Sequence, residues 1–339
     1  MIIDLRSDTV TRPTPGMLKS MFSAKVGDDV FKEDPSINEL EKKAAALFGK
    51  EAGLYCPSGT MTNQTAIKVH TQPGDELLCD VTAHVYNYEG GGIAFNSGVQ
   101  TKLIEGDTGR FTAKQLEQAL HPYADWLPNT SLVTIENTSN RGGGAYYQIK
   151  NVKEISQVCK KNNLALHMDG ARIFNALTET GESPKEYGKV CDSISICLSK
   201  GLGAPVGSVL LGGTGFIAKA RRIRKLLGGG MRQGGYLAAA GIYALDNNIK
   251  RLKEDHQRAK HIAKILMNKS YVADMLPVET NIIIFSLNSS MSAEKYTGEL
   301  KKNNILISSI GKNALRIVTH LDFNDSMLKV VENSLKKIK

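Results

Sequence analysis

The chain contains the stretch Ser193-Ile194-Ser195-Ile196-Cys197-Leu198-Ser199-Lys200-Gly201-Leu202-Gly203-Ala204. Its first half is apolar and rich in β-favouring residues, which predicts a buried strand. The strand ends on the pair Ser199-Lys200, and a glycine-rich loop follows at once. A lysine at the end of a buried strand is costly to desolvate, so its amine needs a partner or a covalent role.

A second strand ends in a similar way upstream. The run Leu164-Ala165-Leu166-His167-Met168-Asp169 closes on a carboxylate and is followed by Gly170-Ala171-Arg172. Neighbouring strands of an α/β sheet place their carboxyl ends together, and ligands bind there. A strand-end lysine and a strand-end aspartate suit pyridoxal phosphate, which needs an amine to bond to its aldehyde and an anion to keep its ring nitrogen protonated.

Length and composition favour a globular protein of two domains. The chain has 339 residues, of which 41% are hydrophobic and 23% are charged, as in ordinary globular proteins. No apolar run approaches the length of a membrane span, and the first residues do not resemble a signal peptide. The five cysteines form no CxxC pair and no zinc spacing, so we expect reduced thiols, no metal site and a cytoplasmic protein.

A net charge of +9 raises the question of nucleic-acid binding. The positive residues are spread along the chain, with one dense cluster at Arg221-Arg222-Ile223-Arg224-Lys225 and a lysine-rich end. No aromatic interleaving or known binding motif accompanies them. We therefore expect solvated helix faces with some anion contacts, and neither a nucleic-acid nor a membrane partner.

Strands and helices alternate through the first two thirds of the chain. The expected strands are Gly53–Cys56, Glu76–Asp80, Gln100–Glu105, Ser131–Glu136, Leu164–Asp169, Ser193–Leu198 and Ser208–Leu211. Helices are expected at Thr62–His70, Thr112–Leu120 and Val152–Asn162, and a capping box at Ser36-Ile37-Asn38-Glu39 opens another that extends to about Phe48. This alternation predicts an α/β fold with a mostly parallel central sheet and helices on both faces.

The pattern changes after about residue 233. A helix-forming run and a charged helical stretch to about Met267 precede strands at Asn281–Ser286, Ile305–Ser308 and Leu315–Thr319, and a last helix from about Asp325. We expect a small C-terminal α+β domain. The predicted division is 1–245 for the large domain with the N-terminal segment and 246–339 for the small domain, with the boundary inside a long connecting helix.

Two further segments follow strand ends. Ser58-Gly59-Thr60 precedes a helix, whose free amides and positive dipole end favour a phosphate group, although an ordinary N-cap serine explains the same residues. His84 follows the strand that ends at Asp80, where an imidazole can stack on a flat ring and act as a base. A hydrogen-bonded histidine near the core is the competing interpretation of His84.

The order of these segments resembles the low-specificity L-threonine aldolases, which are pyridoxal-phosphate enzymes of fold type I in the β-eliminating-lyase superfamily. The resemblance covers nearly the whole chain. It rests on blocks at 5–13 (LRSDTVTRP), 26–30 (VGDDV), 33–35 (EDP), 57–63 (PSGTMTN), 169–172 (DGAR), 198–203 (LSKGLG), 228–233 (GGGMRQ) and 315–320 (LRIVTH).

The resemblance implies a role for each matched position. Lys200 would bond covalently to the cofactor, Asp169 would pair with its ring nitrogen, and His84 would stack on the ring and help to remove the substrate hydroxyl proton. Further residues would bind the cofactor or the amino-acid carboxylate: Ser58, Gly59 and Thr60 at the phosphate, and Ser7, Arg172 and Arg316 at the carboxylate, with Arg232 close to the site. A homodimer or homotetramer with sites at the subunit interface is also implied.

Two positions depart from the family pattern. Where many members have Glu-Asn-Thr-His-Asn, this chain has Glu136-Asn137-Thr138-Ser139-Asn140, and where many have Val-Tyr-Gly it has Val30-Phe31-Lys32. Ser139 would stand at the substrate hydroxyl, where a serine cannot relay a proton near neutral pH as imidazole can. We expect poor discrimination between threo and erythro substrates and room for an aromatic β-substituent.

The implied function is cleavage of L-threonine, L-allo-threonine or a related L-3-hydroxy-amino acid to glycine and an aldehyde. Three alternatives stay open: a β-eliminating lyase or a transaminase on the same cofactor, and a catalytically weak protein that binds pyridoxal phosphate. Product analysis separates the enzymes, because glycine plus an aldehyde indicates retro-aldol cleavage, whereas a keto acid plus ammonia indicates elimination.

Overall fold

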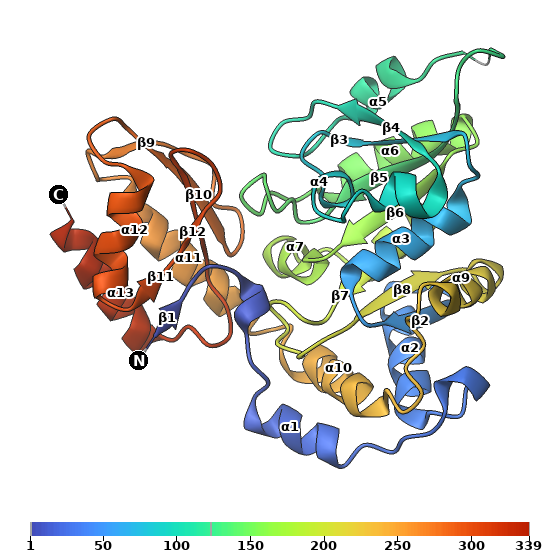
Figure 1. The fold of residues 1–339 in the computed structure, drawn as a ribbon, viewed down its shortest axis with the longest axis horizontal. Helices are drawn as coiled ribbons and strands as arrows, with labels where there is room; N and C mark the ends of the chain where they lie inside the picture. The colour runs from blue at the N-terminus through green and yellow to red at the C-terminus, as the bar shows by residue number, and fades with distance from the viewer. Residues whose placement is uncertain (1, 123, 339) are drawn as a thin grey trace.

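The computed structural model describes residues 2–122 and 124–338. Its main body is built on a seven-stranded sheet in the order β2-β8-β7-β6-β5-β3-β4 (Figure 1). The strands are β2 (Ala52–Cys56), β3 (Asp75–Asp80), β4 (Gln100–Ile104), β5 (Asn129–Glu136), β6 (Ala165–Gly170), β7 (Ser193–Cys197) and β8 (Ser208–Gly212). Only β8 runs antiparallel to its neighbours, so the mostly parallel sheet is confirmed.

Helices cover both faces of this sheet, because alternate strand side chains face opposite sides. Tyr55 joins the core under α2, α6 and α8, whereas its neighbours Leu54 and Cys56 join the core under α3 and α9. The helices of this body are α1 (Pro15–Phe22), α2 (Pro35–Phe48), α3 (Gly59–His70), α4 (His84–Asn87), α5 (Ala113–Ala119), α6 (Ile149–Lys161), α7 (Ile173–Thr180), α8 (Pro184–Val190), α9 (Thr214–Leu226) and α10 (Gly235–Asn247).

The start of α2 differs from the sequence prediction. Asp34, not Ser36, is the N-cap, and its Oδ1 accepts a hydrogen bond from the Ile37 amide at 2.9 Å. Ser36 instead donates its hydroxyl to the Lys25 carbonyl at 2.7 Å. Pro35 occupies the first helical position, which suits proline because no amide is needed there. The capping box was therefore wrong, although the helix it announced is present.

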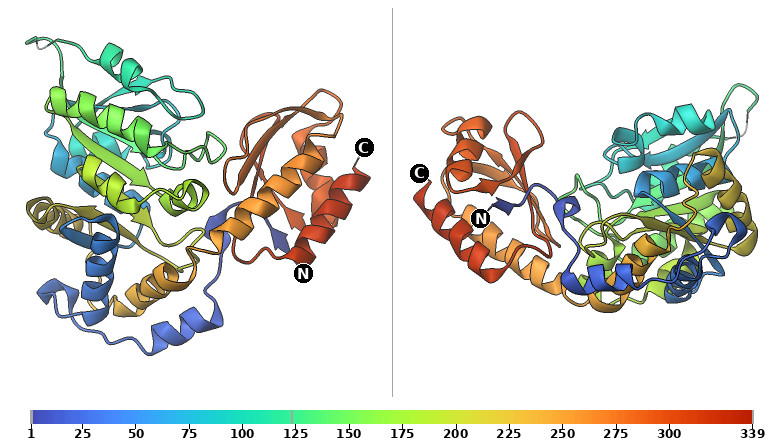
Figure 2. Two further views of the ribbon diagram at one scale, coloured as in Figure 1. Left: turned by 180° about the vertical axis from the view of Figure 1, so that it is seen from behind. Right: turned by 60° about the horizontal axis from the view of Figure 1, so that its bottom comes forward.

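The C-terminal body has its own core and sheet. Strands β9 (Val272–Met275), β10 (Ile282–Leu287), β12 (Ser308–Ser309) and β13 (Ala314–Val318) form an antiparallel sheet in the order β12-β13-β10-β9, with α11 (Leu252–Leu266), α12 (Ala293–Lys302) and α13 (Asp325–Lys337) beside it. The N-terminal strand β1 (Ile3–Asp4) pairs with β11 (Ile305–Leu306) and lies against this body (Figure 2).

The two largest apolar cores are separate, and the domain boundary near residue 245 stays a prediction. Residues from Ala259 onward fill the smaller core together with Ile3 and Leu5, whereas Leu252 still belongs to the larger core. Ile3 and Leu5 therefore pack with the C-terminal body, which their position in the sequence did not indicate. The large domain begins in structural terms only after this N-terminal strand.

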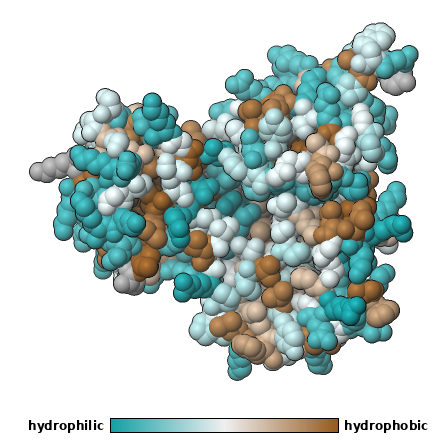
Figure 3. Space-filling model, viewed as in Figure 1, coloured by the Kyte–Doolittle hydropathy of each residue, from teal (hydrophilic) through white to brown (hydrophobic). Residues whose placement is uncertain are grey.

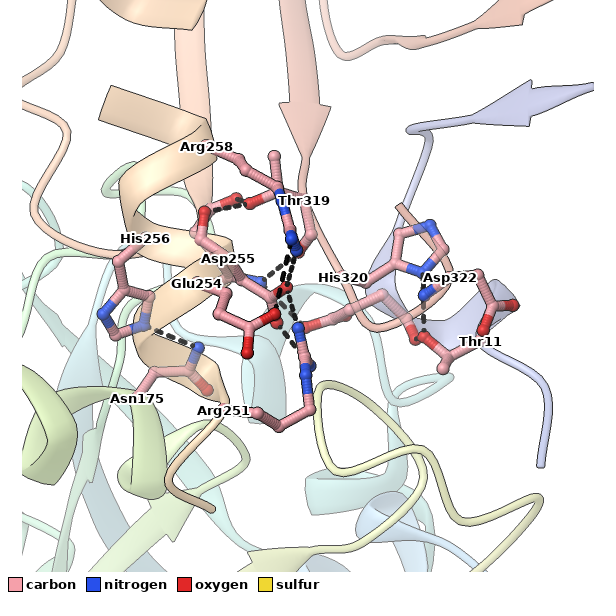
Figure 4. A network of polar contacts seen from close by, with 12 residues as sticks. Thr11, Asn175, Arg251, Glu254, Asp255, His256, Arg258, Thr319, His320 and Asp322 are labelled. Carbon is pink, nitrogen blue, oxygen red and sulfur yellow. Dashed lines mark hydrogen bonds and ion pairs between the residues drawn. The ribbon is translucent and has the colours of Figure 1, made fainter. Parts of the chain in front are cut away.

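The sequence predicts one long helix at the junction between the bodies, but the structure has two shorter ones. α10 ends at Asn247, a turn follows, and α11 begins at Leu252. Figure 4 shows the polar contacts that hold the start of α11. Asp255 pairs with Arg251 and receives the Thr319 hydroxyl on its carbonyl at 2.7 Å, while the Asn175 amide meets His256 at 3.1 Å. α11 is thereby attached to both bodies.

All five cysteines are free and buried. Within residues 2–122 and 124–338, no helix has both the length and the apolar composition needed to cross a bilayer.

Candidate active site

A cavity of about 540 Å³ lies where the carboxyl ends of the central strands face the C-terminal body. Its walls come from the N-terminal segment, from the segments that follow β3, β5, β6 and β7, and from β12 and β13. The lining residues are Ser7, Thr9, His84, Tyr88, Asn140, Arg141, Arg172, Lys200, Ser308, Ser309, Ile310 and Arg316. The fold thus brings together segments that are far apart in the sequence.

Lys200 and Asp169 occupy neighbouring strand ends, as the sequence predicted. β6 and β7 are parallel neighbours in which Asp169 lies opposite Ser195, and Lys200 follows β7 into the cavity wall. The Asp169 carboxylate is buried and fixed from two sides. Its Oδ1 accepts the Ala171 amide at 3.1 Å, and its Oδ2 accepts the Asn63 side-chain amide at 2.9 Å.

A line of buried polar groups runs behind Asp169. Asn63 Oδ1 lies 3.1 Å from His167 Nε2, His167 Nδ1 lies 2.8 Å from the Ser193 hydroxyl, and that hydroxyl meets His70 Nε2 at 2.8 Å. Burial lowers the pKa of His167 to about 3 and that of His70 to about 4, so both rings are neutral.

The direction of this line follows from the donors available. Asn63 Oδ1 can only accept, so His167 Nε2 carries the proton and its Nδ1 accepts from Ser193. Each hydrogen bond therefore donates toward Asn63, which in turn donates to Asp169. Cooperative hydrogen bonds of this kind stabilise the negative charge at the end of the line.

His84 lies at the start of α4 and contacts a buried carboxylate. Its Nδ1 lies 2.9 Å from Glu89 Oε1, and the same carboxylate receives amide groups from Asn63 and Gln64. Burial favours the neutral ring, but the Glu89 bond and the charges of Asp169 and Glu136 raise the pKa of His84 above its ordinary value. The Nδ1 bond leaves Nε2 as the ring atom that can accept a proton.

A ring nitrogen of His84 and one carboxylate oxygen each of Glu89 and Asp169 all lie within 4.8 Å of one another. Three such groups could hold a metal ion. Here the amides of Asn63 and Gln64 already donate to the carboxylates, which accounts for the cluster as a hydrogen-bonded network.

Glu136, the last residue of β5, connects two walls of the cavity. Its Oε2 accepts the His84 backbone amide and its Oε1 accepts the Asn140 backbone amide, each at 3.0 Å. Complete burial and the nearby negative charge of Asp169 raise the pKa of Glu136 to about 7. A single carboxyl group therefore fixes the segment that carries His84 and the segment that carries Asn140.

The segment 58–60 opens α3 as predicted. The Ser58 hydroxyl caps the helix by accepting the Met61 amide at 3.2 Å. At Gly59, an added Cβ would meet only the Ser208 hydroxyl at 3.5 Å, so space is open beside the backbone. That buried hydroxyl has no hydrogen-bond partner among the described residues. These features fit an anion at the helix N-terminus, next to exposed Thr60.

Arg172 is less available than the sequence suggested. It donates from Nε and Nη2 to the two carboxylate oxygens of Asp8, both at 2.7 Å. Both residues are buried, and Asp8 comes directly after Ser7, a residue that lines the cavity. Arg172 therefore reaches a substrate only through Nη1, for which the described residues provide no partner.

Arg316, on β13, presents its guanidinium to the cavity from the opposite side. Its Nη1 donates to the Asn140 side-chain oxygen at 2.8 Å and its Nη2 to the Arg6 carbonyl at 3.1 Å. Its Nε is buried without a partner in the described part of the chain. No acid among the described residues pairs with this guanidinium, so it is better placed than Arg172 to accept a carboxylate as a partner.

With this geometry established, comparisons with known proteins can be interpreted. Residues 4–290 match the model of the β-eliminating lyase family. The chain is 43% identical to the low specificity L-threonine aldolase of Escherichia coli strain K12 over 97% of both sequences. It is 40% identical to low-specificity L-threonine aldolase 1 of Arabidopsis thaliana, over 94% of this chain and 91% of the plant protein. The chain belongs to the low-specificity L-threonine aldolase family.

Solved structures show the same fold. A Leishmania major threonine aldolase aligns over 99% of both chains with a TM-score of 0.85 at 20% identity. A Listeria monocytogenes structure described as a putative L-allo-threonine aldolase aligns over 99% of this chain and 96% of its own, with a TM-score of 0.82. The fold type I prediction and the prediction of a lyase are both confirmed.

Three residues that the sequence analysis of this aldolase family member singled out, Ser139, Phe31 and Arg232, do not line the cavity. The buried Ser139 hydroxyl accepts the Gly142 amide at 3.1 Å and faces Gly109. Phe31 is 71% exposed. Arg232 is an exposed residue whose Nε lies 3.8 Å from Asp28. Ser139, Phe31 and Arg232 are therefore not among the residues that line this cavity, and the roles predicted for Ser139 and Arg232 stay predictions.

The basic cluster at 221–225 is partly internal. Arg224 is buried, donates to the Tyr55 carbonyl at 2.6 Å and pairs with Asp29. Arg221 pairs with Glu41 at 2.6 Å. Two of the cations in this cluster are therefore neutralised by acids.

Sequence reasoning missed the residues that support the site. They are Asp8, Asn63, Glu89, Glu136, Asn140, Arg141 and His167. Asn63, Glu136 and His167 sit inside a helix or strands, where a polar side chain looks like any other. Asp8 and Asn63 lie in blocks quoted for the family resemblance, and Glu136 and Asn140 lie in the stretch compared with the family pattern, but no role was assigned to any of them.

Proposed function

We propose that this chain is a pyridoxal-phosphate-dependent aldolase that cleaves L-threonine, L-allo-threonine or a related L-3-hydroxy-amino acid to glycine and an aldehyde. One observation carries the proposal. Lys200, His84 and Arg316 line one cavity, with Asp169 on the strand next to Lys200. Relatives at 40–43% identity are named for this activity, which adds support.

The residues present fit the cofactor. Lys200 offers the amine for the covalent bond, and Asp169 offers a fixed carboxylate for the ring nitrogen. Open space beside Gly59 at the N-terminus of α3 suits the phosphate. His84 supplies a flat ring on the cavity wall.

The cofactor, when bound, supplies an electron sink for the bond that breaks at Cα. The chain's own residues do the rest. Arg316, with Nη1 of Arg172, holds the amino-acid carboxylate and so fixes rotation about the bond to Cα. His84 Nε2 accepts the hydroxyl proton, because Glu89 occupies Nδ1 and stabilises the protonated ring.

A borohydride experiment tests the cofactor assignment. The purified protein should absorb in the visible range, and borohydride should remove that absorbance irreversibly. A peptide map should then carry the pyridoxyl group on Lys200. Label on another lysine would contradict the assignment.

Product analysis tests the reaction. L-threonine, L-allo-threonine and phenylserine should each be supplied to the holoenzyme, and glycine plus the matching aldehyde should appear. A keto acid and ammonia would instead support a β-eliminating lyase. Arg316→Ala should raise KM and lower kcat together while cofactor stays bound, because substrate binding and bond alignment depend on one guanidinium.

The assembly proposed for this aldolase is a homodimer or homotetramer with residues shared between sites. Apolar side chains reach the surface of the large body in several patches (Figure 3). They include Phe22, Phe31, Phe95 and Leu226, each more than two thirds exposed. Exposed apolar patches mark association surfaces. Phe31 and Arg232 lie in neighbouring segments, which are joined by a hydrogen bond from the Asp29 amide to the Arg232 carbonyl. Light scattering on the wild type and on Phe31→Asp tests this assembly, because it measures the mass of the particle.

The cytoplasmic location also remains a proposal, supported by five unpaired cysteines.

A further inference from the structure

The cavity lining has an unusual charge balance. Among its residues are Arg141, Arg172, Arg316 and Lys200, and none of the lining side chains is an acid. Asp8 neutralises Arg172. Under the proposed function, Lys200 bonds to the cofactor and Arg316 takes the substrate α-carboxylate. Arg141 is then a cavity cation with no anion assigned to it.

Arg141 is held in place at the cavity edge. Its Nη1 donates to the Ile310 carbonyl at 3.1 Å, across the gap between the two bodies. Its guanidinium carbon lies 5.6 Å from the centroid of the Tyr88 ring, a cation–π contact. No carboxylate in the described part of the chain pairs with it. The remaining donors of the guanidinium are therefore positioned by a carbonyl and an aromatic face, yet keep their hydrogen-bonding capacity.

Arg141 and Arg316 act on the same space. Burial lowers the pKa of Arg316, and the positive charges of Arg172 and Arg141 lower it further. Two guanidiniums that face one cavity without an acid between them repel each other, and a ligand with two negative groups relieves that repulsion. Arginine is suited to this task because it binds carboxylates in a planar, two-point geometry.

We propose that Arg141 is a specificity-determining residue that binds a negatively charged β-substituent, so that the preferred substrates are L-3-hydroxy-amino acids with a carboxylate on Cβ, such as L-3-hydroxyaspartate. The inference rests on the proposed function, because it assigns the α-carboxylate to Arg316. Tyr88 shares in the subsite by holding the guanidinium plane.

The reaction balances for this substrate class. The hydroxyl on Cβ loses its proton, the Cα–Cβ bond breaks, and its electron pair stays with Cα, which then takes up a proton. The products are glycine and glyoxylate, with no change in the total number of atoms or electrons. The β-carboxylate leaves as part of glyoxylate, so Arg141 holds a group present in both substrate and product.

Kinetics on the holoenzyme test the proposal. We expect kcat/KM for L-3-hydroxyaspartate to exceed that for L-threonine by at least tenfold. Arg141→Gln should lower that ratio at least tenfold. Arg222→Gln, at an exposed arginine on α9, is the matched control and should leave the ratio unchanged. Tyr88→Phe should keep the ratio, whereas Tyr88→Leu, which removes the aromatic face, should lower it.

Binding gives a readout that does not depend on turnover. L-aspartate lacks the hydroxyl group and cannot be cleaved, so calorimetry can compare its Kd with that of L-alanine. Arg141→Gln should weaken aspartate binding at least tenfold more than it weakens alanine binding. Equal losses for both ligands, or a wild type that does not prefer the diacid, would overturn the inference. A wild type that cleaves no 3-hydroxy-amino acid at all overturns the proposed function instead. A preference for phenylserine would show that the region around Arg141 binds an aromatic group, and it would overturn the assignment of a negatively charged β-substituent.

Discussion

Arg172 and Asp8 form a two-point ion pair inside the protein, although they lie 164 positions apart in the chain. The pair joins the N-terminal segment to the loop after β6. Asn281, at the start of β10, also approaches Asp8 at 3.4 Å. Burial raises the pKa of Asp8, but the Arg172 charge and hydrogen bonds and the Lys200 charge lower it more, to about 2. Asp8 thus connects both bodies behind the cavity.

Removing the Asp8 charge should destabilise the fold. Asp8→Asn leaves the buried Arg172 cation without its anion, and we expect a loss of about 3 kcal/mol in the free energy of unfolding at pH 7. Because the folded pKa of Asp8 is depressed, its stabilisation is present above pH 4 and is lost as pH falls through about 2. The difference between wild type and variant should therefore shrink in acid.

Chemical denaturation at pH 7 and at pH 3 measures this difference. The control is Asp4→Asn, which breaks a largely exposed pair with Arg6 and should cost less than about 1 kcal/mol. Equal losses in the free energy of unfolding for the two variants would show that the buried pair stabilises the fold no more than the exposed pair does.

The sheet could be predicted closely from the sequence, and the supporting site residues could not. Buried strands are continuous apolar runs of fixed length, so each of the seven central strands was placed within about two residues of its observed bounds. Lys200 and Asp169 were recognisable because both lie at the carboxyl ends of such runs, where α/β sheets bind ligands. Asn63 and His167 lie within a helix and a strand, and only the folded arrangement shows that they support Asp169.

The errors have specific physical causes. Ser36 satisfied the capping-box pattern, but Pro35 next to Asp34 is the stronger start signal. β1 has only two residues, too few for any periodicity, and its pairing with β11 is a contact between the two ends of the chain. The role that the resemblance implies for Ser139 stays a prediction, and in the folded chain its hydroxyl accepts the Gly142 amide.

Lys32 is held in the left-handed backbone region, with φ 61° and ψ 31°. Its backbone accepts the Asn38 side-chain amide and donates to Asp29, so the conformation is fixed from both sides. The family pattern has glycine here. Lys32→Gly should raise the free energy of unfolding by about 0.5–1 kcal/mol, because glycine adopts this region without the Cβ penalty. Lys32→Ala keeps the penalty, so thermal unfolding should show a gain for glycine alone.

Glu136 should make the apoprotein less stable as pH rises through neutrality. Its folded pKa, about 7, lies above the ordinary value of 4.5, so its favourable contribution is complete below pH 4.5 and is lost as pH rises through 7. The expected loss is on the order of 1–3 kcal/mol. Glu136→Gln cannot ionise and should flatten the profile between pH 5 and 8, while exposed Glu39→Gln should not. Denaturation midpoints of the cofactor-free protein that fall equally in both variants would refute the role.

Glu89 should set the pH at which His84 begins to work. The Glu89 bond and the neighbouring carboxylates raise the pKa of His84, so the ring keeps its proton to higher pH than a free histidine would. A base must lose that proton before it can accept one from the substrate, so kcat/KM should rise with pH through this value.

Glu89→Gln removes one negative charge but keeps an oxygen for His84 Nδ1–H. The pKa of His84 should fall, and the acid limb of the kcat/KM profile should move to lower pH by at least half a unit. Gln100→Glu, which adds a carboxylate elsewhere on β4, is a charge control and should leave that limb in place. If Glu89→Gln lowers kcat equally at every pH without moving the limb, Glu89 has a purely structural role and the proton acceptor is not His84.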